Sequence, residues 1–140
     1  MSLISDKNFH VEIITPERVR FGGDALMLSV PGVEGQMGLL ANHAPILSLL
    51  QAGRLTLQTR ESTVNMAVGP GFVKMSNNRA VCLVDFAENA GDIDKAAAER
   101  RRAELEKQLA AESDSVKQDA LRTQLRAELA RLEVAGARGA

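Results

Sequence analysis

Hydrophobic and polar residues alternate along the first part of the chain, and this alternation ends near Gly91. Such alternation is the pattern of strands that bury one face. Six runs fit it or are rich in strand-forming residues: 10–14, 25–30, 54–59, 64–68, 72–75 and 79–86. Turn residues recur about every ten positions, a spacing typical of an antiparallel sandwich or barrel. We therefore predict an antiparallel β-sandwich domain over residues 1–90.

One turn in this part is marked strongly. Ser76-Asn77-Asn78 separates two strand-like runs. Asparagine tolerates the positive φ that a tight hairpin turn requires. The segment therefore predicts a β-hairpin formed by residues 72–75 and 79–86.

Beyond Gly91, residues 92–135 contain neither glycine nor proline. The run 95–99 consists of strong helix formers, so a helix is expected there. Asp92 is its expected N-cap, and Asp94 is well placed for the positive end of the helix dipole.

A second helix is expected where residues 112–115 interrupt this pattern. Ser115 and Gln118 fit a capping box, which begins a helix. Four leucines then recur at helical spacing and form an apolar stripe: Leu121, Leu125, Leu129 and Leu132. A short turn makes consecutive helices antiparallel, so we predict a C-terminal two-helix hairpin over residues 91–140.

The apolar surface of this hairpin is narrow. The first helix offers mainly alanines, together with Ile93, Leu105 and Leu109. Alanine side chains bury little area, so the hairpin is expected to hold itself and its docking surface weakly. Two interpretations stay open: a mobile hairpin that detaches from the sandwich, and a static hairpin packed permanently on it.

The composition argues against several classes of protein. The 140 residues carry a formal net charge of −1 and no Trp or Tyr, unlike a nucleic-acid-binding protein. No run of about 18 apolar residues indicates a membrane span. Residues 1–9 include charges and no apolar region, so a secretory signal is not expected. Cys82 is the only cysteine, so no intrachain disulfide can form and a reducing cytoplasm is the expected compartment.

Three segments carry residues that some active sites use. The glycine cluster 32–38 has G-x-x-G-x-x-G spacing without a following lysine, which favours a turn-rich connection over a phosphate-binding loop. His43 lacks the nucleophile and acid that a catalytic histidine needs, which favours a loop or interface residue. Cys82 lies in an apolar run, which favours a buried, unreactive thiol. No spacing of His, Cys and acidic residues indicates a metal site.

A basic run, Arg100-Arg101-Arg102, lies in the first predicted helix. Nearby acids can pair with such a run on a solvated face: Glu99, Glu104 and Glu106. The functional alternative is a contact with an acidic partner surface or a nucleotide phosphate. The residues alone leave both interpretations open.

Residues 30–45 read Val-Pro-Gly-Val-Glu-Gly-Gln-Met-Gly-Leu-Leu-Ala-Asn-His-Ala-Pro. This segment closely resembles the signature loop of epsilon subunits of bacterial F-type ATP synthases, V-x-G-x-E-G-x-x-G-(I/L)-x-x-x-H-A-P. Residues 15–23, 68–73 and 81–88 are similar to other segments of that family, in the same order. The resemblance covers essentially the whole chain, although the helical part is similar in composition only.

The resemblance implies a ten-stranded β-sandwich followed by a helical hairpin, in agreement with the predicted elements. It implies a non-catalytic central-stalk subunit that couples proton-driven rotation of the membrane rotor ring to the gamma subunit. The sandwich would contact the ring and gamma at Glu34, Gln36 and His43. Gln36 departs from the family, whose members often carry an acidic residue there. The chain would lie at the cytoplasmic face of the bacterial inner membrane, held peripherally through the complex.

The family also implies a regulatory hairpin, which extends along gamma toward the alpha and beta subunits and inhibits ATP hydrolysis. Six arginines would then face acidic surfaces of those subunits: Arg100, Arg101, Arg102, Arg122, Arg126 and Arg131. Some members bind ATP through an (I/L)-D-x-x-R-A motif that stabilises the folded hairpin. The matching residues here are Ile93, Asp94, Ala97 and Ala98. Because Ala97 replaces the motif's arginine, we expect no cofactor and weak or absent ATP binding.

Two other functions stay open at this stage. One is an enzyme that uses Cys82 or His43, which a slow, denaturant-dependent reaction of the thiol would argue against. The other is a free-standing β-sandwich adaptor whose hairpin recruits a partner protein. Co-purification with a gamma subunit would favour the stalk subunit over the adaptor.

Overall fold

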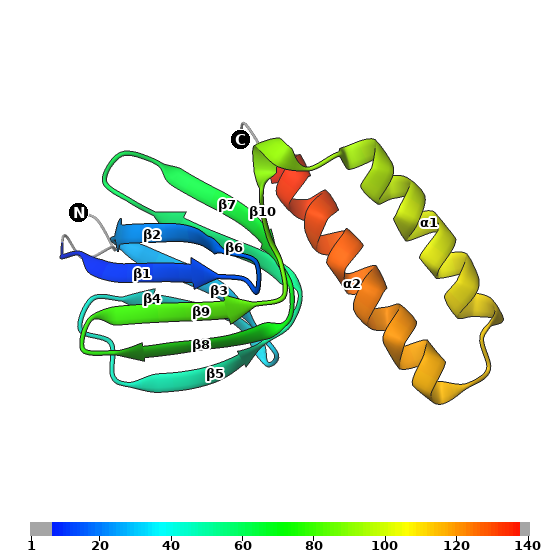
Figure 1. The fold of residues 1–140 in the computed structure, drawn as a ribbon, viewed down its shortest axis with the longest axis horizontal. Coiled ribbons are helices and arrows are strands. Elements are labelled where there is room, and N and C mark those ends of the chain that lie inside the picture. Colours follow the sequence, from blue (N-terminus) through cyan, green and yellow to red (C-terminus); the bar gives the residue numbers. More distant parts are fainter. Residues whose placement is uncertain (1–6, 138–140) are drawn as a thin grey trace.

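Ten strands and a pair of helices make up the computed structural model, which describes residues 7–137 (Figure 1). The strands are β1 (Phe9–Ile14), β2 (Val19–Ala25), β3 (Met27–Gly32), β4 (Gly35–Leu40), β5 (Ile46–Leu50), β6 (Gly53–Gln58), β7 (Thr63–Val68), β8 (Gly71–Ser76), β9 (Arg79–Val84) and β10 (Ala87–Asn89). A short 3₁₀ turn (Ala90–Asp92) leads to helices α1 (Lys95–Ala111) and α2 (Ser115–Ala137). The predicted fold class, a β-sandwich followed by a helical hairpin, is confirmed. The prediction about a secretory signal falls mostly on residues outside the described range.

The strands form two layers. Their hydrogen-bonded order is β10-β7-β6-β3-β5-β8-β9-β1-β2, with β4 paired to β3. The β1–β9 pair is parallel, with His10 opposite Arg79, and the other pairs are antiparallel. A single residue pair, Gly32 with Leu50, joins β3 to β5 within residues 7–137. The path therefore bends at that point, and the strands on either side of it form the two layers.

The main core lies between these layers and is made by strand residues. In β1, Phe9, Val11 and Ile13 alternate toward the interior, as the sequence pattern predicts. Leu55 and Leu57 of β6 are fully buried in the same cluster. Burying one such side chain contributes about 1.5–3 kcal/mol. Since this cluster contains no helix residue from the described part of the chain, the sandwich has a hydrophobic core of its own.

The glycine cluster 32–38 forms a hairpin rather than a turn-rich connection. Val33-Glu34 alone make the turn, and Gly35 to Leu40 pair with β3 as strand β4. Gly35 takes a φ of 133°, which favours glycine, and so allows the tight turn. The prediction was wrong in extent because pairing along β3 outweighs the weak strand preference of glycine.

The hairpin turn predicted at Ser76-Asn77-Asn78 is confirmed. Asn77 and Asn78 have φ values of 52° and 58° and join β8 to β9. The side-chain amide of Asn78 donates to the Asn42 side-chain oxygen at 3.0 Å. This bond ties the loop after β4 to the β8–β9 turn.

Helix α1 begins two residues later than predicted. Asp94, not Asp92, is its N-cap, and its side chain accepts a hydrogen bond from the backbone N–H of Ala97 at 3.0 Å. Asp92 lies in the preceding 3₁₀ turn. That turn follows β10 and delays the start of the helix.

The predicted capping box of α2 is also wrong. Asp114 caps the helix, accepting from a backbone N–H three residues on at 3.0 Å, and Ser115 is already helical. Gln118 instead donates to the carbonyl oxygen of Glu112 at 2.6 Å. An aspartate at the cap also interacts favourably with the helix dipole, which explains why it replaces the serine.

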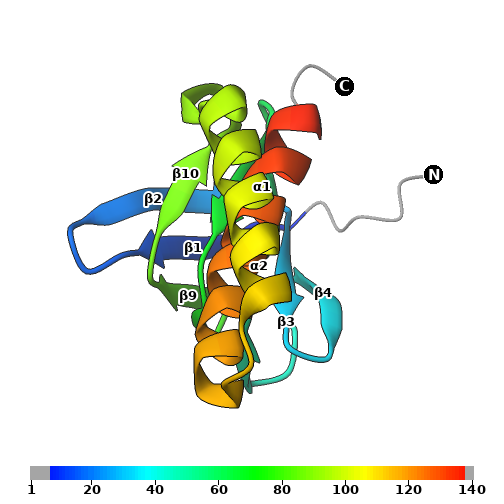
Figure 2. The ribbon, with the colours of Figure 1, turned by 90° about the vertical axis from the view of Figure 1, so that its right-hand side faces the viewer.

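Helix α2 lies between the sandwich and α1 (Figures 1 and 2). It packs on β6 and β7, whereas α1 packs on α2. The predicted leucine stripe does not form the docking face, since Leu129 is 48% exposed. Ala130 and Val134 are buried against the sandwich instead. The position of β6 and β7 selects this face of the helix, and helical spacing alone does not reveal it.

Candidate functional site

The helices dock on the sandwich through a small apolar cluster. Ala67 of β7, Ala130 and Val134 are its buried members. Phe86, Ala90 and Ile93 pack around them. The cluster is separate from the main core and contains several alanines, so it contributes far less burial energy. The predicted weakness of the docking surface stays a prediction.

A chain of ion pairs runs beside this cluster and connects β10, α2 and α1. Arg131 of α2 donates to both carboxylate oxygens of Glu88, at 2.8 and 3.2 Å. Its Nη1 also donates to Glu128 at 2.6 Å. The second oxygen of Glu128 accepts from Arg101 of α1 at 3.0 Å. We call these four residues the ion-pair chain: Glu88, Arg131, Glu128 and Arg101.

The ion-pair chain is partly withdrawn from water. The side chains of Arg131 and Glu128 are 16% and 8% exposed. Burial by itself lowers the pKa of Arg131, but hydrogen bonds and charges from Glu88 and then Glu128 outweigh it and raise that pKa above its usual value. The guanidinium also lies over the ring of Phe86, 4.4 Å from its centroid. Arg131 is therefore the main polar contact between the hairpin and the sandwich.

The six predicted regulatory arginines fall into two groups. Four are paired within the folded chain: Arg101 with Glu128, Arg102 with Glu99 and Glu106, Arg122 with Asp119, and Arg131 with Glu88 and Glu128. Arg100 and Arg126 are exposed and make no ion pair within residues 7–137. The solvated interpretation of the basic run thus describes the folded state, and the predicted contacts with alpha and beta remain a prediction for another state.

The residues of the degenerate ATP motif serve the fold in this state. Ile93 packs at the docking cluster, and Asp94 caps α1. Ala98 is fully buried and Ala97 is half-buried. The expectation of weak or absent ATP binding stays a prediction.

The structure does not bring the predicted ring and gamma contacts together. Glu34 is exposed in the β3–β4 turn, and His43 lies beyond the far end of β4. The six residues of β4 separate them by roughly 20 Å at about 3.3 Å per residue. A single loop around both residues was assumed from the motif, and strand β4 divides it.

Gln36 has a role within the sandwich. Its side-chain amide donates to the hydroxyl of Ser29 at 2.9 Å and to the carbonyl oxygen of Arg54 at 3.0 Å. Pro31, which pairs with Gln36, has no N–H to offer the neighbouring strand β6. The glutamine amide reaches across the proline and supplies a donor there.

The two candidate catalytic residues, Cys82 and His43, lie in different surroundings. Cys82 is fully buried, and burial raises its pKa from 9.0 to about 12, so its thiol stays protonated near neutral pH. The predicted buried thiol is confirmed. His43 Nδ1 lies 2.7 Å from the carbonyl oxygen of Ala44. Within residues 7–137 no three His, Cys, Asp or Glu side chains gather closely enough to hold a metal ion.

An exposed apolar surface covers the outer side of β5, β8 and β9. Leu47 and Leu49 of β5 are 69% and 64% exposed. Leu49 lies opposite Phe72 of β8, which lies opposite Leu83 of β9. We call these four residues the apolar face. The sequence signal was β5 itself, because Ile46–Leu50 is apolar except at Ser48, and its exposed positions 47 and 49 are both leucine.

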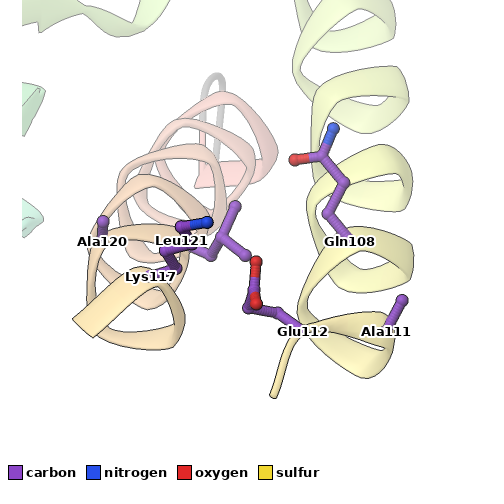
Figure 3. Close-up of a pocket in the computed structure, with 6 residues that line it drawn as sticks. All are labelled: Gln108, Ala111, Glu112, Lys117, Ala120 and Leu121. Atoms are coloured by element: carbon purple, nitrogen blue, oxygen red, sulfur yellow. The ribbon is translucent and has the colours of Figure 1, made fainter. Parts of the chain in front are cut away.

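The helices leave a hollow of about 460 Å³ between them at the hairpin's tip (Figure 3). Gln108 and Ala111 of α1 line one side, and Lys117 and Leu121 of α2 line the other. The hollow is open to solvent where the chain turns. No helix among the described residues is both long and apolar enough to cross a membrane.

Comparison with known proteins gives consistent results. Residues 8–90 match the family model of the ATP synthase delta/epsilon chain β-sandwich domain. The chain is 35% identical over 131 residues to the ATP synthase epsilon chain of Moorella thermoacetica, covering 93% of this chain and 98% of that one. It is 39% identical over 107 residues to that of Pelotomaculum thermopropionicum, covering 76% and 80%.

Solved structures agree on the fold. A chain in the cryo-EM structure of the Euglena gracilis mitochondrial ATP synthase (OSCP/F1/c-ring) superposes with a TM-score of 0.76, covering 97% of this chain and 86% of that one. At 17% identity this likeness concerns the fold alone.

Proposed function

This chain belongs to the family of ATP synthase epsilon chains, and from that membership we propose that it is a non-catalytic central-stalk subunit. It couples rotation of the proton-driven membrane ring to the gamma subunit, and its helices inhibit ATP hydrolysis. In this role the chain lies peripherally at the cytoplasmic face of the bacterial inner membrane. The burial of Cys82 supports a role without chemistry of its own.

One observation carries the regulatory part of the proposal. The sandwich has a complete core of strand residues, whereas the hairpin is attached by the small docking cluster, the ion-pair chain and a more exposed ion pair between Arg54 and Glu133. Detaching the hairpin would expose few large side chains, so its cost is low compared with unfolding the sandwich. The sandwich can then stay anchored while the helices reach a partner.

The apolar face supports a stable anchor on gamma. Leu47, Leu49, Phe72 and Leu83 form a continuous apolar patch on a single layer of the sandwich. Exposed patches of this kind mark protein interfaces. The exposed turn at Glu34 lies at one end of β4 and remains the proposed contact with the ring.

In the detached state the hairpin would present its arginines to the alpha and beta subunits. Arg100 and Arg126 are exposed already, and Arg131 loses Glu88 as a partner when α2 leaves β10. Acidic surfaces would pair with these side chains. ATP is not required for this mechanism, because Ala97 stands at the position of the motif's arginine.

The test is ATP hydrolysis by the soluble catalytic complex, reconstituted with the full chain or with a truncation after Gly91. We expect both forms to bind and the full chain alone to suppress hydrolysis. Equal hydrolysis with both bound forms would show that the hairpin does not inhibit, and the proposed role would then be coupling alone. Failure of both forms to bind would overturn the stalk role.

Binding through the apolar face is tested separately. Leu49→Glu places a charge at the centre of this face and should abolish binding to a complex that contains gamma. Leu129→Glu is the matched control, since Leu129 is similarly exposed but lies on α2. Equal binding of both variants would show that gamma docks elsewhere.

A further inference from the structure

The two interfaces that hold the helices in place are closed by different ion pairs: Arg131 with Glu88 between α2 and the sandwich, and Arg101 with Glu128 between the two helices. One oxygen of Glu128 accepts from Arg131 on the same helix, and the other accepts from Arg101 on α1. From this arrangement we infer that release of the hairpin occurs in two separable steps. The inference rests on the proposed function for its biological purpose and adds that the two interfaces open independently of each other.

In the first step α2 leaves the sandwich. This movement breaks the two hydrogen bonds from Arg131 to Glu88 and separates Arg131 from Phe86. It also breaks the ion pair between Arg54 of β6 and Glu133 of α2 and opens the docking cluster. The bond from Arg131 to Glu128 persists, because both residues lie on α2 three positions apart. Arg131 therefore keeps a partner for its charge after it leaves Glu88.

The same step leaves the two helices joined. Arg101 still pairs with Glu128, and Leu105 of α1 stays buried. Since α1 lies on the far side of α2 from the sandwich, undocking does not disturb this packing (Figure 2). The hairpin leaves as an intact pair of helices.

In the second step α1 separates from α2. This breaks the bond between Arg101 and Glu128 and exposes Leu105. Neither of these changes involves Glu88 or Phe86.

The two steps predict different effects for two arginine substitutions. Arg131→Gln should raise the undocked fraction about tenfold or more, since it removes two charge-assisted hydrogen bonds to the carboxylate of Glu88. Arg101→Gln should leave docking unchanged and raise the fraction of chains with separated helices by about two- to fivefold. The effect is smaller because Arg101 is more than half exposed. Arg126→Gln, which removes an exposed arginine from α2, should change neither.

Fluorine NMR of the full chain labelled with fluorophenylalanine measures the first step. The chain has four phenylalanines. Phe86 lies under Arg131 at the docking cluster, whereas Phe9, Phe21 and Phe72 lie in the sandwich and report whether it is folded. Hydrogen exchange of the α1 amides measures the second step.

Because Arg131 lies over the Phe86 ring, undocking is measured as a second Phe86 signal in exchange with that of the docked state, and not as a shift alone. The expected result is a larger second signal in Arg131→Gln alone, and faster α1 exchange without that signal in Arg101→Gln. An equal second signal in both variants would make release a single step and overturn the inference. An unchanged second signal in Arg131→Gln would overturn it as well. Because these measurements use the isolated chain, their outcome is independent of whether the chain binds the catalytic complex.

Discussion

Shortening Val134 to alanine should loosen the hairpin without weakening the sandwich. Val134 is fully buried, and it packs in the docking cluster rather than in the main core. Val134→Ala removes two methyl groups from this cluster, a loss of about 1.6 kcal/mol at about 0.8 kcal/mol for each buried group. That loss corresponds to roughly a 15-fold rise in the ratio of undocked to docked hairpin.

The assay compares the Phe86 fluorine signal with the thermal unfolding of the sandwich. Val73→Ala is the matched control, since it removes the same groups from a fully buried site in the main core. We expect Val134→Ala to enlarge the second Phe86 signal with little change in the unfolding midpoint, and Val73→Ala to lower that midpoint. If Val134→Ala lowers the midpoint as much and leaves Phe86 unchanged, then hairpin and sandwich unfold together and the reasoning is refuted.

Three further predictions follow from individual contacts. Asp94→Ala should destabilise α1 by about 1 kcal/mol through loss of the cap, seen as faster exchange of its first amides and not those of α2. Gly71→Ala should lower the unfolding midpoint strongly, because a Cβ there would lie 1.9 Å from the carbonyl oxygen of Leu83, whereas Gly38→Ala, with open space around it, should not. The pKa of Cys82 is raised from 9.0 to about 12 in the folded chain, so the contribution of this thiol to the free energy of unfolding is at its maximum below pH 9. It should decline as pH rises from about 9 to about 12, and Cys82→Ser should remove that decline in denaturant titrations.

The sandwich could be predicted from the sequence because its signal is local. Alternation in a run such as 54–59 indicates a strand, and the asparagines at 77–78 indicate a turn. Strand β4 was missed for the opposite reason, since its glycines form a strand only through pairing with β3. Missing β4 also caused Glu34 and His43 to be placed in a single loop.

The contacts of the docked hairpin could not be predicted in this way. Glu88 and Arg131 are 43 residues apart, and no periodicity connects them. The leucine stripe of α2 was visible, but the buried face is set by the surface of β6 and β7, which the sequence of the helix does not contain. The alanine content of the docking cluster could be predicted, because it is a property of the helix sequences and not of their partners.

The parallel pairing of β1 with β9 has a consequence for the order in which the chain is made. His10 pairs with Arg79, so the layer that contains β1 can close only after β9 has been synthesised. Contacts between such distant residues form slowly, and the open layer exposes apolar edges during synthesis. Strand β10, which carries Glu88, follows immediately, and the helices come last from the ribosome. The hairpin docks on β6, β7 and β10, which belong to the other layer, so its docking does not depend on this late pairing. Chains stopped before residue 84 should be substrates for chaperones and proteases.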